Sequence, residues 1–130
     1  MKNYEKSIFS EFCLTVKLLR SSKGCPWDKK QTAESLKKYI KEECGELLEA
    51  ITDGNHLHTC EENGDLLFLL VLLAQIAEET GTYTMNDVIT GINDKMIRRH
   101  PHVFGDAKIQ TEEELKSQWK KIKSAEALKK

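Results

Sequence analysis

The segment from Thr59 to Glu79 constrains the fold more than any other part of the chain. It contains nine consecutive apolar residues, LLFLLVLLA (66–74), and no proline. We predict a helix over this segment that stops at Gly81. Apolar residues surround such a helix on every side, so it must be deeply buried or pack against helices of another subunit. The apolar run is far shorter than the ~20 residues that span a bilayer, so we expect no membrane segment.

Apolar periodicity and capping residues predict the remaining helices. Thr32 is a candidate N-cap, and Thr84 with Asp87 and Thr111 with Glu114 resemble capping boxes. The predicted helices cover residues 4–21, 32–52, 84–99 and 111–127, with loops at SSKGCPWDKKQT and RRHPHVFGD. No segment is typical of a strand. The sequence therefore predicts one all-α domain over residues 1–130, with helices 32–52 and 59–79 as a central antiparallel pair.

The overall composition excludes a global electrostatic role. The 130 residues carry a formal net charge of −1, which gives no general attraction to nucleic acid or to an acidic membrane. The first residues are too often charged for a signal peptide, so we expect a cytoplasmic protein with reduced cysteines. The motif HLHTC places His56, His58 and Cys60 at alternate positions, which suits an extended segment. A closed zinc site normally needs four ligands, so metal binding by this motif stays open.

The segment KEECGELLEA (41–50) places acidic residues on a helix that must bury one face. At about 100° per residue, Glu42 and Glu49 fall on the polar side, and Glu46 lies at the boundary of the apolar arc. Glu43 falls inside that arc, between Leu36 and Ala50. A carboxylate taken from water needs a cation or a proton, because its uncompensated burial costs several kcal/mol.

The following helix supplies complementary acids. Glu62 and Asp65 are three residues apart and share a helix face, as do Glu43 and Glu46. Four converging carboxylates would repel one another and raise each other's pKa values. A hard divalent cation relieves that repulsion, so we predict a site for Mg²⁺, with Mn²⁺ as a possible substitute.

Basic residues near the end of the helix 84–99 are candidates for phosphate binding. Lys95, Arg98 and Arg99 occupy neighbouring helical positions, and guanidinium groups suit bidentate phosphate contacts. The alternative is a basic last turn that complements the helix dipole. Trp27 is expected to anchor its loop to the core, whereas for Trp119 both anchoring and stacking on a base stay open.

Four segments, GCPWDKKQT, EECGE, ENGDLLF and KMIRRHPHVFGD, occur in this order. Together they resemble the MazG family of nucleoside triphosphate pyrophosphohydrolases, over roughly Leu14 to Lys123. The resemblance implies a helical bundle completed by homodimerisation, or a dimer of dimers. It also implies Mg²⁺-dependent cleavage between the α- and β-phosphates, which yields a nucleoside monophosphate and pyrophosphate and serves nucleotide-pool housecleaning.

The resemblance also assigns residues to roles. The family's metal motifs fall on Glu42, Glu43 and Glu46, and on Glu62 and Asp65. Its phosphate-contacting positions fall on Lys95, Arg98 and Arg99, and its late tryptophan on Trp119.

From these assignments we expect a mechanism with distinct groups for the metal, the water and the leaving group. The expected metal ligands are Glu43, Glu46, Glu62 and Asp65. Glu42 is the candidate general base, and Lys95 with either arginine would offset charge on the leaving pyrophosphate. Two alternatives stay open: a pyrophosphatase confined to one substrate, of the dCTP or phosphoribosyl-ATP type, and a non-catalytic nucleotide-binding helical dimer. Base preference, metal count and the identity of the base also stay open.

Overall fold

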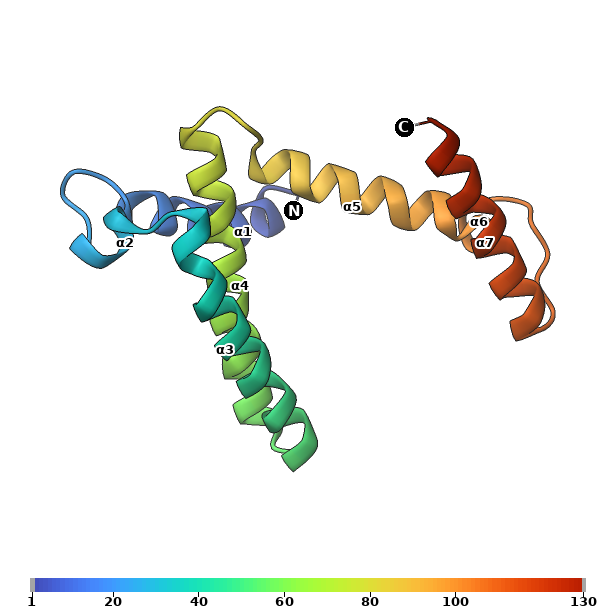
Figure 1. Ribbon diagram of the computed structural model, residues 1–130, viewed down its shortest axis with the longest axis horizontal. Coiled ribbons are helices and arrows are strands. Elements are labelled where there is room, and N and C mark those ends of the chain that lie inside the picture. The colour runs from blue at the N-terminus through green and yellow to red at the C-terminus, as the bar shows by residue number, and fades with distance from the viewer. Residues whose placement is uncertain (1, 130) are drawn as a thin grey trace. The chain divides into compact units, whose positions relative to one another are not determined.

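The computed structural model describes residues 2–129, with side chains from residue 8 onward. These residues form helices joined by loops, and none of them lies in a strand, which confirms the predicted all-α class (Figure 1). The helices are α1 (Lys2–Leu19), α2 (Pro26–Lys30), α3 (Ala33–Asp53), α4 (His56–Glu79), α5 (Met85–Arg99), α6 (Pro101–Phe104) and α7 (Glu112–Lys129). No helix in the described part of the chain is long and apolar enough to cross a membrane.

The helices form two compact units. The first comprises the chain up to Met85 and the second begins at Asn86. The first unit therefore holds α1 to α4, and the second holds nearly all of α5 together with α6 and α7.

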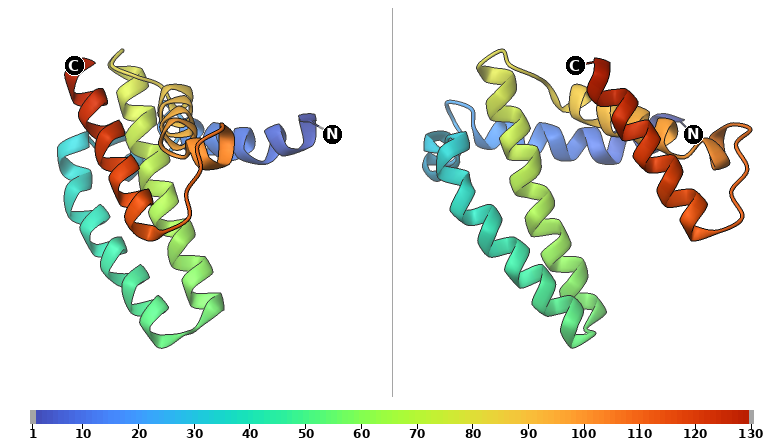
Figure 2. Two further views of the ribbon diagram at one scale, coloured as in Figure 1. Left: turned by 90° about the vertical axis from the view of Figure 1, so that its right-hand side faces the viewer. Right: turned by 45° about the vertical axis from the view of Figure 1, so that its right-hand side comes forward.

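The first unit is built on an antiparallel pair of helices, α3 and α4, which lie side by side in both views of Figure 2. At the start of α3, the Thr32 hydroxyl accepts from the Ser35 amide at 3.1 Å, and the Ser35 hydroxyl accepts from the Thr32 amide at 2.9 Å. This reciprocal capping confirms Thr32 as the N-cap. At the other end, Gly54 turns the chain with φ of 70°, a conformation that favours glycine.

The core of this unit lies where α4 meets α1 and α3. Val16, Leu36 and Leu72, one from each of these helices, are fully buried. Other apolar side chains of α4, including Leu67 and Leu70, remain 41% and 45% exposed. The unit thus covers only part of the apolar surface that surrounds α4.

Arg20 ties the connection between α1 and α3 to the far end of α4. Its guanidinium donates to the Glu79 carboxylate through Nε at 2.9 Å and Nη2 at 2.7 Å. Nη1 also donates to the backbone oxygens of Asp28 and Gln31. Charge-assisted bonds of this kind lower the pKa of Glu79 and fix the segment that leads into α3.

Three local expectations from the sequence were wrong. The predicted loops at 21–32 and 100–106 each contain a short helix, α2 and α6, because Pro26 and Pro101 occupy first helical positions that need no amide hydrogen. In addition, α4 begins at His56 rather than near Thr59. The Asn55 side chain caps it by accepting from the His58 amide at 3.0 Å, so the motif HLHTC is helical and not extended.

Gly24 provides a test of this packing. A Cβ atom at Gly24 would lie 2.1 Å from the Leu19 carbonyl oxygen, whereas one at Gly45 would meet no atom within 4 Å. We expect Gly24→Ala to lower the free energy of unfolding by about 1–3 kcal/mol, as overpacking does. Gly45→Ala, within α3, should raise it by up to about 1 kcal/mol. Urea unfolding followed by circular dichroism measures both, and equal effects of the two changes would contradict this account.

Candidate metal centre

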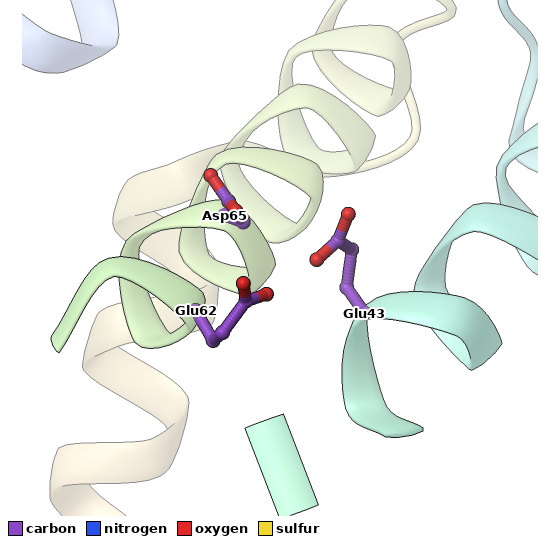
Figure 3. A group of neighbouring side chains, drawn as sticks. All are labelled: Glu43, Glu62 and Asp65. Atoms are coloured by element: carbon purple, nitrogen blue, oxygen red, sulfur yellow. The ribbon is translucent and has the colours of Figure 1, made fainter. Parts of the chain in front are cut away.

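Three carboxylates meet between α3 and α4. Glu43 extends from α3 toward Glu62 and Asp65 on α4 (Figure 3). One oxygen from each lies within 4.8 Å of the others. The turn between the helices explains this register, because Glu43 precedes Gly54 by 11 residues and Asp65 follows it by 11. In an antiparallel pair, positions equally distant from the turn come to the same level.

The cluster extends from the interior to the surface. Glu62 is buried, Glu43 is half-buried and Asp65 is exposed. The prediction that Glu43 lies inside is therefore confirmed in position. The exposed side at Asp65 leaves the cluster open to a ligand that approaches from solvent.

The electrostatics of the cluster favour a cation. Burial, then the negative charge of Glu46, and then Glu62 and Asp65 raise the pKa of Glu43 to about 7. Glu43 Oε2 and Glu62 Oε2 are buried without a hydrogen-bond partner. Buried carboxylate oxygens are normally satisfied, and those left without a donor are the atoms that a hard divalent ion would contact. The residues present thus fit a Mg²⁺ or Mn²⁺ ion.

Glu46 and Glu42 occupy a different position from these three residues. Both are exposed, and with Glu49 they line a shallow hollow on the outer side of α3. Glu46 contributes to the raised pKa of Glu43, so it is close enough to influence the cluster electrostatically. The assignment of Glu46 as a ligand and of Glu42 as a base stays a prediction.

His58 is a neighbour of the cluster that the sequence interpretation did not place there. Its Nε2 lies 3.2 Å from Glu62 Oε1, one helical turn away on α4. The spacing of four residues between His58 and Glu62 would have indicated this contact in a helix. The sequence interpretation missed it because it took HLHTC as extended. Within residues 2–129, the group of side chains that could hold a metal includes none of His56, His58 and Cys60.

The second unit contains the predicted phosphate-binding residues. Arg98 Nε donates to Glu126 Oε2 at 2.6 Å, and Arg99 Nη2 donates to Glu126 Oε1 at 2.8 Å. These bonds, from Arg99 and then Arg98, lower the pKa of Glu126 to about 2. Lys95 is half-buried on the same helix. The structure thus shows an ion-pair partner on α7 that the sequence interpretation missed.

The two tryptophans both have structural contacts. Trp119 Nε1 donates to the backbone oxygen of Arg99 at 2.9 Å, and its ring meets His100 edge-on with 6.0 Å between centroids. Trp119 therefore anchors α7 to the end of α5, and a role in stacking on a base stays a prediction. Trp27 packs against the core and meets Tyr39 edge-on at 5.2 Å, which confirms its expected anchoring role.

Residues 31–104 match the MazG nucleotide pyrophosphohydrolase domain, a stretch that includes α3, α4 and the cluster between them. The chain belongs to this family. The fold agrees, because the crystal structure of a mazG-related protein from Thermotoga maritima aligns with a TM-score of 0.74 and 28% identity. That alignment covers 88% of this chain and 98% of the Thermotoga chain.

Three longer relatives have higher sequence identity to this chain. The chain is 50% identical over 123 residues to the nucleoside triphosphate pyrophosphohydrolase/pyrophosphatase MazG of Thermotoga maritima, covering 95% of this chain and 47% of that protein. It is 53% identical over 118 residues to the uncharacterized protein YabN of Bacillus subtilis, covering 91% and 24%. It is 44% identical over 103 residues to the nucleoside triphosphate pyrophosphohydrolase of Escherichia coli K12, covering 79% and 39%. The chain thus spans about a quarter to a half of the length of these curated relatives.

The Glu126 ion pairs predict a pH-dependent stability of the second unit. Because the pKa of Glu126 in the folded state lies below its ordinary 4.5, its contribution is present above pH 4.5 and is lost as pH falls toward 2. We expect Glu126→Gln to lower the melting temperature at neutral pH. The difference in melting temperature between this variant and the parent should shrink as the pH falls from 4.5 toward 2. Fluorescence in a Trp27→Phe background reports on this unit, because Trp119 is then the remaining tryptophan.

The matched control for this experiment is Glu113→Gln. Glu113 lies on the same helix and has no arginine partner among the described residues. The Glu113→Gln substitution should therefore leave the melting temperature nearly unchanged. A Glu126→Gln effect that is the same at acid and neutral pH would show that the carboxylate charge contributes nothing.

Proposed function

We propose that this chain is a Mg²⁺-dependent nucleoside triphosphate pyrophosphohydrolase. The reaction adds water across the anhydride between the α- and β-phosphates and gives a nucleoside monophosphate and pyrophosphate. The observation that carries the proposal is the cluster of Glu43, Glu62 and Asp65, with its two donorless buried oxygens, in a chain of the MazG family. The names of the relatives from Thermotoga and Escherichia support the same substrate class.

Each acidic residue has a proposed part in this reaction. Glu43, Glu62 and Asp65, together with Glu46, would hold Mg²⁺ against the triphosphate. When bound, the ion supplies Lewis-acid neutralisation of the phosphate oxygens. With a pKa raised to about 7, Glu43 is partly protonated at neutral pH, and a bound cation would favour its ionised form.

Other residues are proposed to activate the attacking water and to stabilise the leaving pyrophosphate. Glu42, next to Glu43 and exposed, is the proposed base that removes a proton from the attacking water. Lys95 with Arg98 or Arg99 would offset the charge that develops on pyrophosphate as the anhydride bond breaks. A phosphate that binds either arginine would compete with the Glu126 carboxylate for that guanidinium group or use the N–H groups that Glu126 leaves free. Trp119 is the proposed contact for the nucleobase.

Substitution of a proposed metal ligand tests this function. With Mg²⁺ present, we expect pyrophosphate release from a panel of ribo- and deoxynucleoside triphosphates, and none with excess EDTA. Glu43→Gln should reduce kcat by a factor of about 10² or more, because it removes a charged ligand in the middle of the cluster. Glu49→Gln, an exposed change on the same helix, is the matched control and should retain activity.

The same panel separates the alternatives. Turnover of a single nucleotide would indicate a narrow-substrate pyrophosphatase, and nucleotide binding by calorimetry without any product would indicate a non-catalytic binding protein. Wild-type turnover by Glu43→Gln would contradict the metal assignment. Circular dichroism should show that this variant keeps its helical content, since Glu43 is not a member of the hydrophobic core cluster and glutamine has nearly the same shape.

We also propose that the first unit forms a homodimer, with a dimer of dimers as the larger alternative. Leu67 and Leu70, on one face of α4, are partly exposed, as are Leu48 and Ile51 on α3. Apolar side chains gathered on neighbouring helices favour an interface between subunits. A second copy would cover the part of α4 that the first unit leaves open.

Light scattering after size-exclusion chromatography tests this assembly. We expect twice the mass of one chain, or four times for the larger assembly, and a shift toward the monomer for Leu70→Asp, because an interface that buries a carboxylate is weakened. Leu128→Asp, a change at a leucine of α7 that is 89% exposed, should leave the mass unchanged. A monomeric wild-type protein, or a Leu70→Asp variant of unchanged mass, would contradict the proposal.

A further inference from the structure

His58 is the side chain that contacts a carboxylate of the cluster through its ring. Its Nε2 lies 3.2 Å from Glu62 Oε1. An ionised carboxylate only accepts hydrogen bonds, so the imidazole must carry a hydrogen on Nε2 and donate it to Glu62. The two residues are four apart on α4, a spacing that places their side chains on one helix face.

The two carboxylate oxygens of Glu62 differ in their hydrogen bonding. Glu62 Oε1 accepts from His58, whereas Oε2 is buried and has no hydrogen-bond partner. The side chain of Glu62 is only 8% exposed, so water does not orient its carboxylate freely. A bond to one oxygen of a planar carboxylate fixes the direction in which the other oxygen points.

His58 is itself held in place, which makes it suited to orient another residue. Its backbone amide donates to the Asn55 side chain at 3.0 Å, so it belongs to the capped first turn of α4. Its ring is 45% exposed and lies at the edge of the cluster. The imidazole therefore joins the fixed end of the helix to the innermost acid of the cluster.

We propose that His58 is a positioning residue, which orients Glu62 so that Oε2 faces the cation. This inference rests on the proposed metal site and adds a residue that acts through Glu62 without touching the ion. Hydrogen-bonded partners of metal ligands generally contribute in this way, and their loss costs about 10–100-fold in metal affinity or activity. The competing interpretation is an ordinary pair on a helix surface, which adds only a few tenths of a kcal/mol to helix stability.

Titration with Mn²⁺ alone, followed by electron paramagnetic resonance of the free ion, separates the two interpretations without a turnover assay. We expect His58→Leu to weaken Mn²⁺ binding by about 10–100-fold. His58→Gln, whose amide can still donate to Glu62, should bind within a few-fold of wild type. His56→Leu, at an exposed histidine on the same turn, is the matched control and should bind as wild type does. Circular dichroism in EDTA should show that all four proteins keep their helical content at the temperature of the titration.

Steady-state kinetics give a second measurement. In His58→Leu, the Mg²⁺ concentration for half-maximal rate should rise, while the KM for nucleotide at saturating Mg²⁺ should change little. Mn²⁺ affinities of His58→Leu and wild type that are equal would overturn the inference. Equal weakening in His58→Leu and His58→Gln would also overturn it, because a donor would then not be what matters. Failure of wild type itself to bind Mn²⁺ would instead contradict the metal site on which the proposed function depends.

Discussion

Packing of α3 against α4 is the constraint on which the candidate site depends, because it holds the mutually repelling carboxylates of Glu43, Glu62 and Asp65 together. Carboxylate oxygens within 4.8 Å of one another oppose the pairing of α3 with α4, and burial increases their cost. The pKa of Glu43 is raised to about 7 because burial and the neighbouring carboxylates disfavour its ionised form. The helix pair keeps the acids together because Leu36 and Leu72 pack in its core and because both of its ends are restrained.

Those restraints lie on either side of the cluster. At one end, Gly54 and the Asn55 cap set the level at which α4 begins relative to α3. At the other end, Arg20 joins the segment before α3 to Glu79 at the end of α4. A helix pair fixed at both ends cannot slide to relieve repulsion at its middle. A proton on Glu43 or a bound cation lowers that energy without disrupting the packing, and a cation does so while all three carboxylates stay ionised.

The sequence was sufficient for those features that depend on local order along one helix. Periodicity and candidate caps predicted α3 and α5 to within a few residues, periodicity alone predicted α4, and the helical wheel placed Glu43 in the apolar arc. The Arg20–Glu79 pair joins residues 59 apart, and no local pattern encodes it. Glu126 was missed for the same reason, since it meets Arg98 from 28 residues away. The contact of His58 with Glu62 was missed because it requires residue 58 to be helical. The Asn55 cap, which starts α4 before His58, was not recognised in the sequence.

The Glu126 pairing bears on how the proposed substrate would bind. Arg98 and Arg99 already hold a carboxylate, with bonds of 2.6 and 2.8 Å, so a phosphate at either residue would share the guanidinium group with Glu126 or displace it. Where phosphate displaces the carboxylate, the net gain in free energy is the difference between two charge-assisted contacts, which is smaller than the energy of the new contact alone. Triphosphate would still be favoured, since it carries more charge and more acceptor oxygens than one carboxylate. Under this arrangement Glu126 holds both guanidinium groups in place before substrate arrives and offsets one of their two positive charges, and α7 stabilises the second unit in the absence of nucleotide.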